Sequence, residues 1–252
     1  MMPASGLVAA RRRGAYGVDA PWALFGLECG MIAAVGWAIG IASSPAHRWV
    51  WVPSLIALVM LAQIALFVHA TRRGKVHVWA ELLDELGLHG DERVLDLGCG
   101  RGLVLLMAAQ RLATGRAVGV DLWRSVDQSG NAPDVTMRNA HAEGVADRIE
   151  LYTGDMTNLP FGDAGFDVVV SSLAIHNIKD KAGRAKAIDE AVRVLRPGGR
   201  LAIVDISAVD EYQHRLGQTD ARDVRVRPLG WRMWWGGPWM SSRLVTAVKP
   251  IV

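Results

Sequence analysis

The stretch of sequence that decides the fold is Val94-Leu95-Asp96-Leu97-Gly98-Cys99-Gly100-Arg101-Gly102. Apolar residues around one acid are typical of a buried parallel strand, and glycines at every second position are typical of a tight loop. An apolar run at 103–107 follows the last glycine directly and predicts a helix. Together these features predict an α/β sheet whose loop brings backbone N–H groups and a positive helix end to a ligand.

The spacing of the glycines distinguishes between ligands. A dinucleotide loop reads G-x-G-x-x-G, whereas this loop reads G-x-G-x-G and has Asp96 two residues before its first glycine. A carboxylate there would repel a pyrophosphate, but it suits a ligand with an ammonium group, such as S-adenosylmethionine. The stretch resembles motif I of the class I S-adenosylmethionine-dependent methyltransferases. This resemblance implies that the cofactor is bound by Asp96, Gly98, Cys99 and Gly100.

A second buried-strand pattern at 117–121 ends in an acid, Asp121. A carboxylate at this strand end can accept hydrogen bonds from both hydroxyls of a ribose, because the diol presents two donors. Leu122 and Trp123 follow, and we expect them to flank the adenine ring. A third strand is predicted at 148–152 and is closed by Gly154-Asp155-Met156. In the family an Asp here takes the adenine amino group and its neighbour packs on the ring.

A fourth strand at 166–172 resembles motif IV, and we expect Ser171 near its end to contact the cofactor. His176 follows in the loop where small-molecule methyltransferases of the quinone- and sterol-modifying type place substrate-facing residues. Because imidazole titrates near neutral pH, His176 is the candidate catalytic base for a phenol, enol or thiol acceptor. The alternative is a loop histidine that only hydrogen-bonds the backbone. The pattern of amino-methylating nucleic-acid enzymes, Asn/Asp-Pro-Pro-Tyr/Phe, is absent.

The remaining strands complete a seven-stranded, Rossmann-like sheet. The turn Leu-Arg-Pro-Gly-Gly at 195–199 is characteristic of the methyltransferase superfamily and precedes a strand at 201–205. Two more strands are predicted near 223–227 and 244–249. Helices are predicted at 133–144, 181–195 and 209–217. We therefore expect a methyltransferase domain over 71–252, with S-adenosylmethionine as its cofactor and no metal.

Two apolar runs, at 22–42 and 49–69, precede this domain. Each has close to the ~20 residues needed to cross a bilayer, and the first is too long to be a signal peptide. We expect a transmembrane hairpin over 21–70 behind a basic, poorly ordered tail at 1–20; the alternative is a pair of buried helices. Basic residues at 11–13 and 72–75 place both termini and the domain in the cytoplasm. Glycines in the first run predict close helix contacts and a possible homo-oligomer.

The segment 231–240 contains four tryptophans, too many for a loop exposed to water. One interpretation is an interfacial loop that dips into lipid headgroups and walls the entrance for the substrate. The alternative is packing against the helices of the domain or against the hairpin.

These features predict an integral-membrane methyltransferase of the cytoplasmic membrane. Its partners would be the lipid bilayer and a small lipophilic acceptor: a quinone or phenol, an isoprenoid or a hydrophobic thiol. Two alternatives stay open, a phospholipid amine N-methyltransferase and a non-catalytic S-adenosylmethionine-binding membrane scaffold. The net charge of +3 favours no polyanion, so nucleic acid is not an expected partner.

Overall fold

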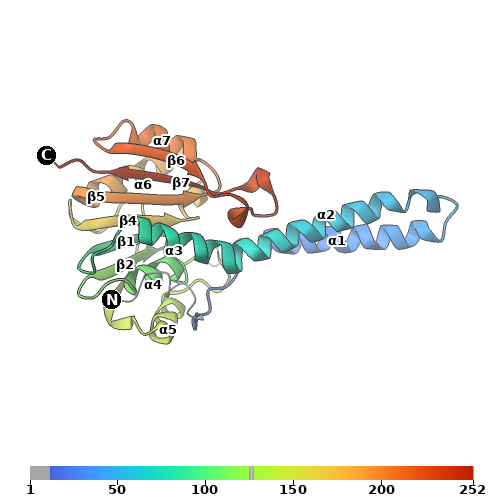
Figure 1. The fold of residues 1–252 in the computed structure, drawn as a ribbon, viewed down its shortest axis with the longest axis horizontal. Helices are drawn as coiled ribbons and strands as arrows, with labels where there is room; N and C mark the ends of the chain where they lie inside the picture. Colours follow the sequence, from blue (N-terminus) through green and yellow to red (C-terminus); the bar gives the residue numbers. More distant parts are fainter. Residues whose placement is uncertain (1–11, 125, 127, 252) are drawn as a thin grey trace.

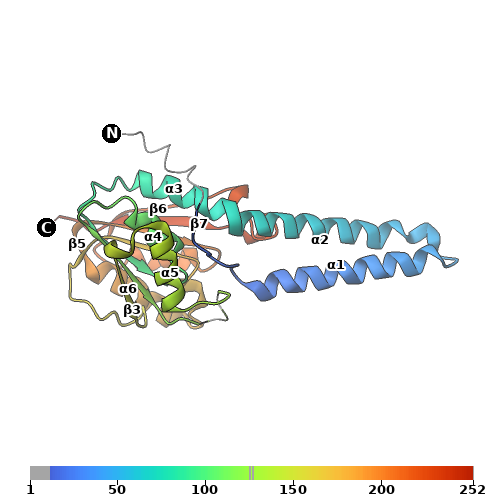
Figure 2. The same cartoon turned by 90° about the horizontal axis from the view of Figure 1, so that it is seen from below.

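The structure, a computed structural model, describes residues 12–124, 126 and 128–251. An α/β unit carries a long helical hairpin that projects from one end of its sheet (Figures 1 and 2). The sheet has seven strands in the order β3-β2-β1-β4-β5-β7-β6, with β7 antiparallel to both neighbours. The strands are β1 (Arg93–Leu97), β2 (Arg116–Asp121), β3 (Ile149–Thr153), β4 (Phe166–Ser172), β5 (Leu195–Asp205), β6 (Arg222–Pro228) and β7 (Arg243–Val248). The predicted seven-stranded α/β sheet is confirmed.

Helices cover both faces of this sheet. They are α3 (Lys75–Glu85), α4 (Leu103–Ala109), α5 (Pro133–Glu143), α6 (Lys181–Val194) and α7 (Val209–Leu216). Side chains alternate along each strand, so Val94 joins the core under α3, α4 and α5, whereas Leu95 joins the core under α6 and α7. Burial on both faces explains why the central strands are almost continuously apolar.

The hairpin consists of α1 (Pro21–Ala42) and α2 (Trp51–His69). Both are long and apolar enough to cross a bilayer by length and composition. A core helix of a soluble protein would be mostly buried, but only 6% and 11% of their most apolar windows are buried here. Of the glycines in α1, Gly30 faces Met60 of α2, whereas Gly26, Gly36 and Gly40 face open space. The predicted homo-oligomer therefore has a free face available but stays a prediction.

The hairpin enters the α/β unit without a linker. After α2 the helix continues through one π-helical turn, Ala70–Gly74, into α3, so that it is unbroken over His47–Glu85. The helix Lys75–Glu85 is thus the last part of a much longer one. At Gly74 its backbone touches the carbonyl group of Arg232, and a Cβ there would collide with that oxygen.

The tryptophan-rich segment packs at this junction. The indole of Trp235 is 5% exposed, donates to Ser242 Oγ at 2.9 Å and lies edge-on to Phe67 of α2, with 5.5 Å between ring centroids. By contrast, Trp231 and Trp239 are 56% and 69% exposed. The interpretation of packing against the hairpin holds for Trp235, and two other tryptophans of the segment present their rings outward.

The expectation of a poorly ordered tail is wrong for the part of it that the structure describes. Residues 12–20 run along the α/β unit before α1, and the backbone N–H of Ala15 donates to Asn139 Oδ1 at 2.9 Å. The tail residues 1–11, with the first of the three arginines, lie outside the described residues.

Candidate cofactor and acceptor site

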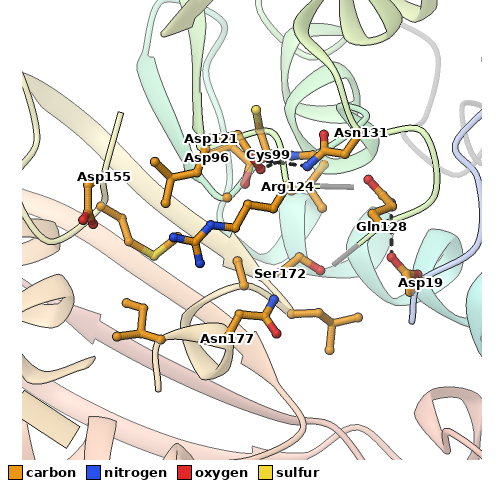
Figure 3. A pocket seen from close by; sticks show the side chains of 18 of the residues that line it. Asp19, Asp96, Cys99, Asp121, Arg124, Gln128, Asn131, Asp155, Ser172 and Asn177 are labelled. Carbon is orange, nitrogen blue, oxygen red and sulfur yellow. Dashed lines mark hydrogen bonds between the residues drawn. The ribbon is translucent and has the colours of Figure 1, made fainter. Parts of the chain in front are cut away.

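A cavity of about 530 Å³ lies where β1, β2 and β4 end (Figure 3). Open α/β sheets bind their ligands at this edge, where the strand order reverses between β1 and β4. Eight of the predicted site residues line it: Asp96, Gly98, Cys99, Gly100, Asp121, Leu122, Asp155 and Met156. The structure thus brings together residues from three separate motifs.

The glycine loop has the backbone geometry that the sequence implied. Gly98 and Gly100 have φ angles of 72° and 51°, the left-handed region that other residues rarely adopt. A Cβ on Gly98 would collide with Ala174, and one on Gly100 would lie 2.5 Å from Gln128 Oε1. The loop therefore has no room for side chains at the positions where its backbone meets the cavity.

Asp121 is fixed at the end of β2 by three donors. Its carboxylate accepts from Gly100 N at 2.8 Å, from Trp123 N at 2.6 Å and from Asn131 Nδ2 at 3.1 Å. These bonds join the second strand end to the glycine loop. Oδ2 accepts only one of these bonds, so it keeps acceptor capacity for a ribose hydroxyl.

The environment of the Asp96 carboxylate favours the binding of a cation. It is 1% exposed, and its Oδ1 has no hydrogen-bond partner among the described residues. Burial raises the pKa of Asp96 to about 7, and the charge of Asp121 acts in the same direction. A buried carboxylate without a partner is costly, so a ligand ammonium would relieve it. The residues present fit the methionine and ribose parts of S-adenosylmethionine.

Three predicted cofactor residues do not line the cavity. Trp123 donates its indole N–H to Thr153 Oγ1 at 2.8 Å, and Gly154 donates its backbone N–H to the carbonyl of Asp121 at 3.2 Å. Ser171 is fully buried and its hydroxyl donates to the carbonyl of Leu97 at 2.8 Å. Since side chains alternate along β4, the next residue, Ser172, lines the cavity in its place. The assignment of Ser171 is corrected accordingly.

His176 lies in the short turn Ile175–Asn177 after β4, beside the cavity rather than in its wall. Its Nδ1 is 2.5 Å from Oδ1 of Asp205, a fully buried residue at the end of β5. Asp205 also accepts from the hydroxyl of Tyr212 at 3.0 Å. Burial raises the pKa of Tyr212 above its usual range, which keeps that hydroxyl protonated and donating. Nδ1 lies against the Asp205 carboxylate without hydrogen-bond geometry, so Nε2 is the nitrogen that can accept a proton from an acceptor.

Three functional residues were not assigned from the sequence: Asp205 beside the cavity, and Gln128 and Asn131 in its wall. Asp205 supports His176, and its signal was available: an acid at the carboxyl end of a buried strand. Gln128 and Asn131 come from the irregular segment between β2 and α5, which carries no periodic pattern. The tryptophan-rich segment contributes none of the described lining residues, and the prediction that it walls the substrate entrance stays a prediction.

Comparison with known proteins agrees with this site. Residues 95–203 match the family model described as a methyltransferase domain. The ubiquinone/menaquinone biosynthesis C-methyltransferase UbiE of Roseobacter denitrificans is 34% identical over 160 residues, which cover 58% of this chain and 60% of that protein. The chloroplastic 2-phytyl-1,4-beta-naphthoquinone methyltransferase of Arabidopsis thaliana is 33% identical over 136 residues, 53% of this chain and 49% of that protein. The chain thus spans about half to three fifths of the length of these relatives.

A solved structure shows the same fold. The geranyl diphosphate C-methyltransferase of Streptomyces coelicolor A3(2) superposes with a TM-score of 0.55 at 18% identity, over 68% of this chain and 74% of that one. The sequence match covers the motifs, and the structural match shows that the fold is shared. The α/β unit of this chain is therefore an S-adenosylmethionine-dependent methyltransferase domain with the class I fold.

Proposed function

We propose that the chain is a membrane-anchored methyltransferase that transfers the methyl group of S-adenosylmethionine to a small lipophilic acceptor, foremost a quinone or phenol precursor. One observation carries this proposal: the cavity is lined by residues that flank the hairpin. Asp19 lies two residues before α1, and Lys75 follows the π-helical turn that ends α2. Figure 1 shows the hairpin leaving from the end of the sheet at which β4 and β5 finish.

The exposed apolar surface of the hairpin supports membrane insertion. The 22 residues of α1 extend about 33 Å, close to the thickness of the hydrocarbon core. Exposed tryptophans stand at both ends of the pair: Trp22 at the base, Trp49 and Trp51 at the tip. Tryptophan rings favour the headgroup level of a bilayer. Trp231 and Trp239 add exposed rings near the base, since Trp231 stacks on His69 with 4.8 Å between ring centroids.

The cavity offers apolar surface for an acceptor, and His176 lies beside it as the candidate base. Leu103, Leu122, Leu173 and Ile178 line it. S-adenosylmethionine supplies a methyl group that its positively charged sulfur makes electrophilic. The chain has to align the acceptor with that methyl, exclude water and remove the acceptor's proton. We assign the last task to Nε2 of His176, with Asp205 stabilising the imidazolium that results.

The names of the relatives favour an aromatic acceptor. Several of them are methyltransferases of ubiquinone, menaquinone or naphthoquinone biosynthesis. The name of one of them specifies a phytyl group, an isoprenoid chain, on the naphthoquinone. An anchored domain whose cavity adjoins the anchor would meet such a molecule without drawing it through water.

Radiolabelled methyl transfer on full-length protein in nanodiscs would test the acceptor. We expect transfer to a demethylated isoprenoid quinol, at a higher rate than to its short-chain soluble analogue. Methylated phosphatidylethanolamine as the only product would contradict the quinol assignment and favour the phospholipid alternative. Cofactor binding without transfer to any acceptor of the panel would favour the scaffold.

Labelling of single cysteines would test the anchor. A cysteine at Ser44, in the turn between α1 and α2, should react with an impermeant reagent from outside the cell. One near the C-terminus should react only after lysis. Full-length protein in the soluble fraction of a detergent-free lysate would contradict the membrane assignment.

A further inference from the structure

The cavity wall carries a buried cation close to its unpartnered carboxylate. Lys75, the first residue of α3, is 6% exposed, and its Nζ lies 2.7 and 2.9 Å from the two oxygens of Asp19. Lys75, Asp19 and Asp96 all line the same cavity. Burial is the largest cause of the raised pKa of Asp96, and the positive charge of Lys75 acts to lower that pKa. Both charged groups therefore belong to the wall of one cavity.

A buried ammonium beside a buried carboxylate matches the two charges of an α-amino acid. A zwitterion needs a cation for its carboxylate and an acceptor for its ammonium, and each contact is strengthened where water is excluded. Arg124 and Lys179 are also lining cations, but both are exposed to solvent. In Figure 3 the Arg124 side chain extends across the cavity toward the side of Asp155, away from Asp19. Lys75 is therefore the cation best placed to act with Asp96.

We propose that Lys75 binds the α-carboxylate of the amino-acid end of S-adenosylmethionine while Asp96 binds its ammonium, and that Asp19 positions Lys75. This rests on the proposed function, because it takes that cofactor as the ligand. Lys75 has three N–H donors, so it can hold Asp19 and a ligand carboxylate together. The segment before α1 thereby becomes part of the cofactor site.

The hydrogen bonds of that segment support a positioning role for Asp19. Gln128 donates through Nε2 to Asp19 Oδ1 and to the carbonyl of Tyr16, each at 3.2 Å. Its Oε1 accepts from the backbone N–H of Arg101, in the glycine loop, at 2.9 Å. Val18 N donates to Ser129 Oγ at 3.2 Å. Asp19 is thus fixed relative to the same loop that the cofactor must contact.

The test compares two ligands that differ only in the carboxylate. Calorimetry on full-length protein in detergent would measure the affinity for S-adenosylmethionine and for decarboxylated S-adenosylmethionine. Lys75→Met should weaken binding of the first at least about tenfold, the range for a lost charge-assisted hydrogen bond, and change the second less than about twofold. Asp19→Asn should show the same selectivity with a smaller loss. Lys186→Met, which removes an exposed charge from α6 outside the cavity, should change neither affinity.

The outcomes separate this proposal from the proposed function. Equal losses for both ligands in Lys75→Met would overturn the proposal, since a structural role affects both alike. A carboxylate-selective loss in Lys179→Met and none in Lys75→Met would also overturn it. Should Lys75→Met not fold, as judged by circular dichroism, Asp19→Asn decides by the same criterion. Wild-type protein that binds neither ligand would contradict the cofactor assignment itself.

Discussion

Replacing Asp96 by asparagine should stabilise the cofactor-free protein at alkaline pH and weaken its binding of S-adenosylmethionine. Burial raises the pKa of Asp96 to about 7, whereas an aspartate in an unfolded chain titrates near ~3.9. Because the unfolded chain loses this proton first, wild-type protein loses stability as the pH rises from about 4 to about 7, and the loss is constant above that range. At about 1.4 kcal/mol per pH unit, the loss between pH 5 and pH 8 is about 2 to 3 kcal/mol.

Asp96→Asn lacks the titrating carboxyl. The difference in free energy of unfolding between this variant and wild type should therefore shift in favour of the variant by about 2 to 3 kcal/mol between pH 5 and pH 8. Any cost of burying the amide is the same at both pH values and cancels. Urea denaturation followed by tryptophan fluorescence, in detergent at pH 5 and pH 8, would measure it. Asp147→Asn is the matched control, because that carboxylate is exposed in the turn Ala146–Arg148.

The same variant should bind S-adenosylmethionine about 10- to 100-fold more weakly, since the ligand ammonium loses a charged partner. This combination of gained stability and lost affinity is what a residue held ready for a cation should show. An advantage that does not change with pH would refute the account of Asp96 as a buried, uncompensated carboxyl. Unchanged affinity would refute its role toward the ammonium.

Three further predictions follow from the other parts of the site and from the junction. Asp121→Ala should weaken S-adenosylmethionine binding by about 1.5 to 3 kcal/mol, through lost hydrogen bonds to a charged group, as measured by calorimetry. Trp235→Ala should cost about 3 to 5 kcal/mol of stability by emptying its site against Phe67, whereas Trp239→Ala, at an exposed position, should change the midpoint of thermal unfolding little. His176→Ala should slow transfer to a phenolic acceptor about 10²- to 10⁴-fold in single-turnover assays without changing cofactor affinity; an equal slowing for an acceptor that has no proton to lose would contradict the base assignment.

Much of the fold could be predicted because the central strands carry their signal locally. Buried parallel strands are apolar on both faces and end in glycine or acid, so the second predicted strand, 117–121, lies at Arg116–Asp121 in the structure. The cofactor loop could be predicted for the same reason, since its glycines are needed by the backbone itself. The helix predicted directly after the loop lies at Leu103–Ala109 in the structure.

What could not be predicted depends on contacts between distant segments. Gln128 reaches Tyr16 across 112 residues, and neither residue lies in a periodic pattern. The choice between Ser171 and Ser172 depends on which face of β4 points to the cavity. Two adjacent serines do not show from the sequence which of them lies on that face. Composition likewise could not show that Trp235 turns inward and Trp239 outward, because both suit a membrane-proximal loop.

The unbroken helix over His47–Glu85 connects the hairpin rigidly to the wall of the cavity. At ~1.5 Å per residue its 39 residues form a rod of about 58 Å. Trp79, near its far end, donates to Ser172 Oγ at 2.8 Å, in the cavity wall. A spanning hairpin answers a thinner or thicker bilayer by tilting. Under the proposed membrane insertion, such a tilt would act as a lever on α3, so that the thickness of the surrounding lipid would tune the geometry of the cavity.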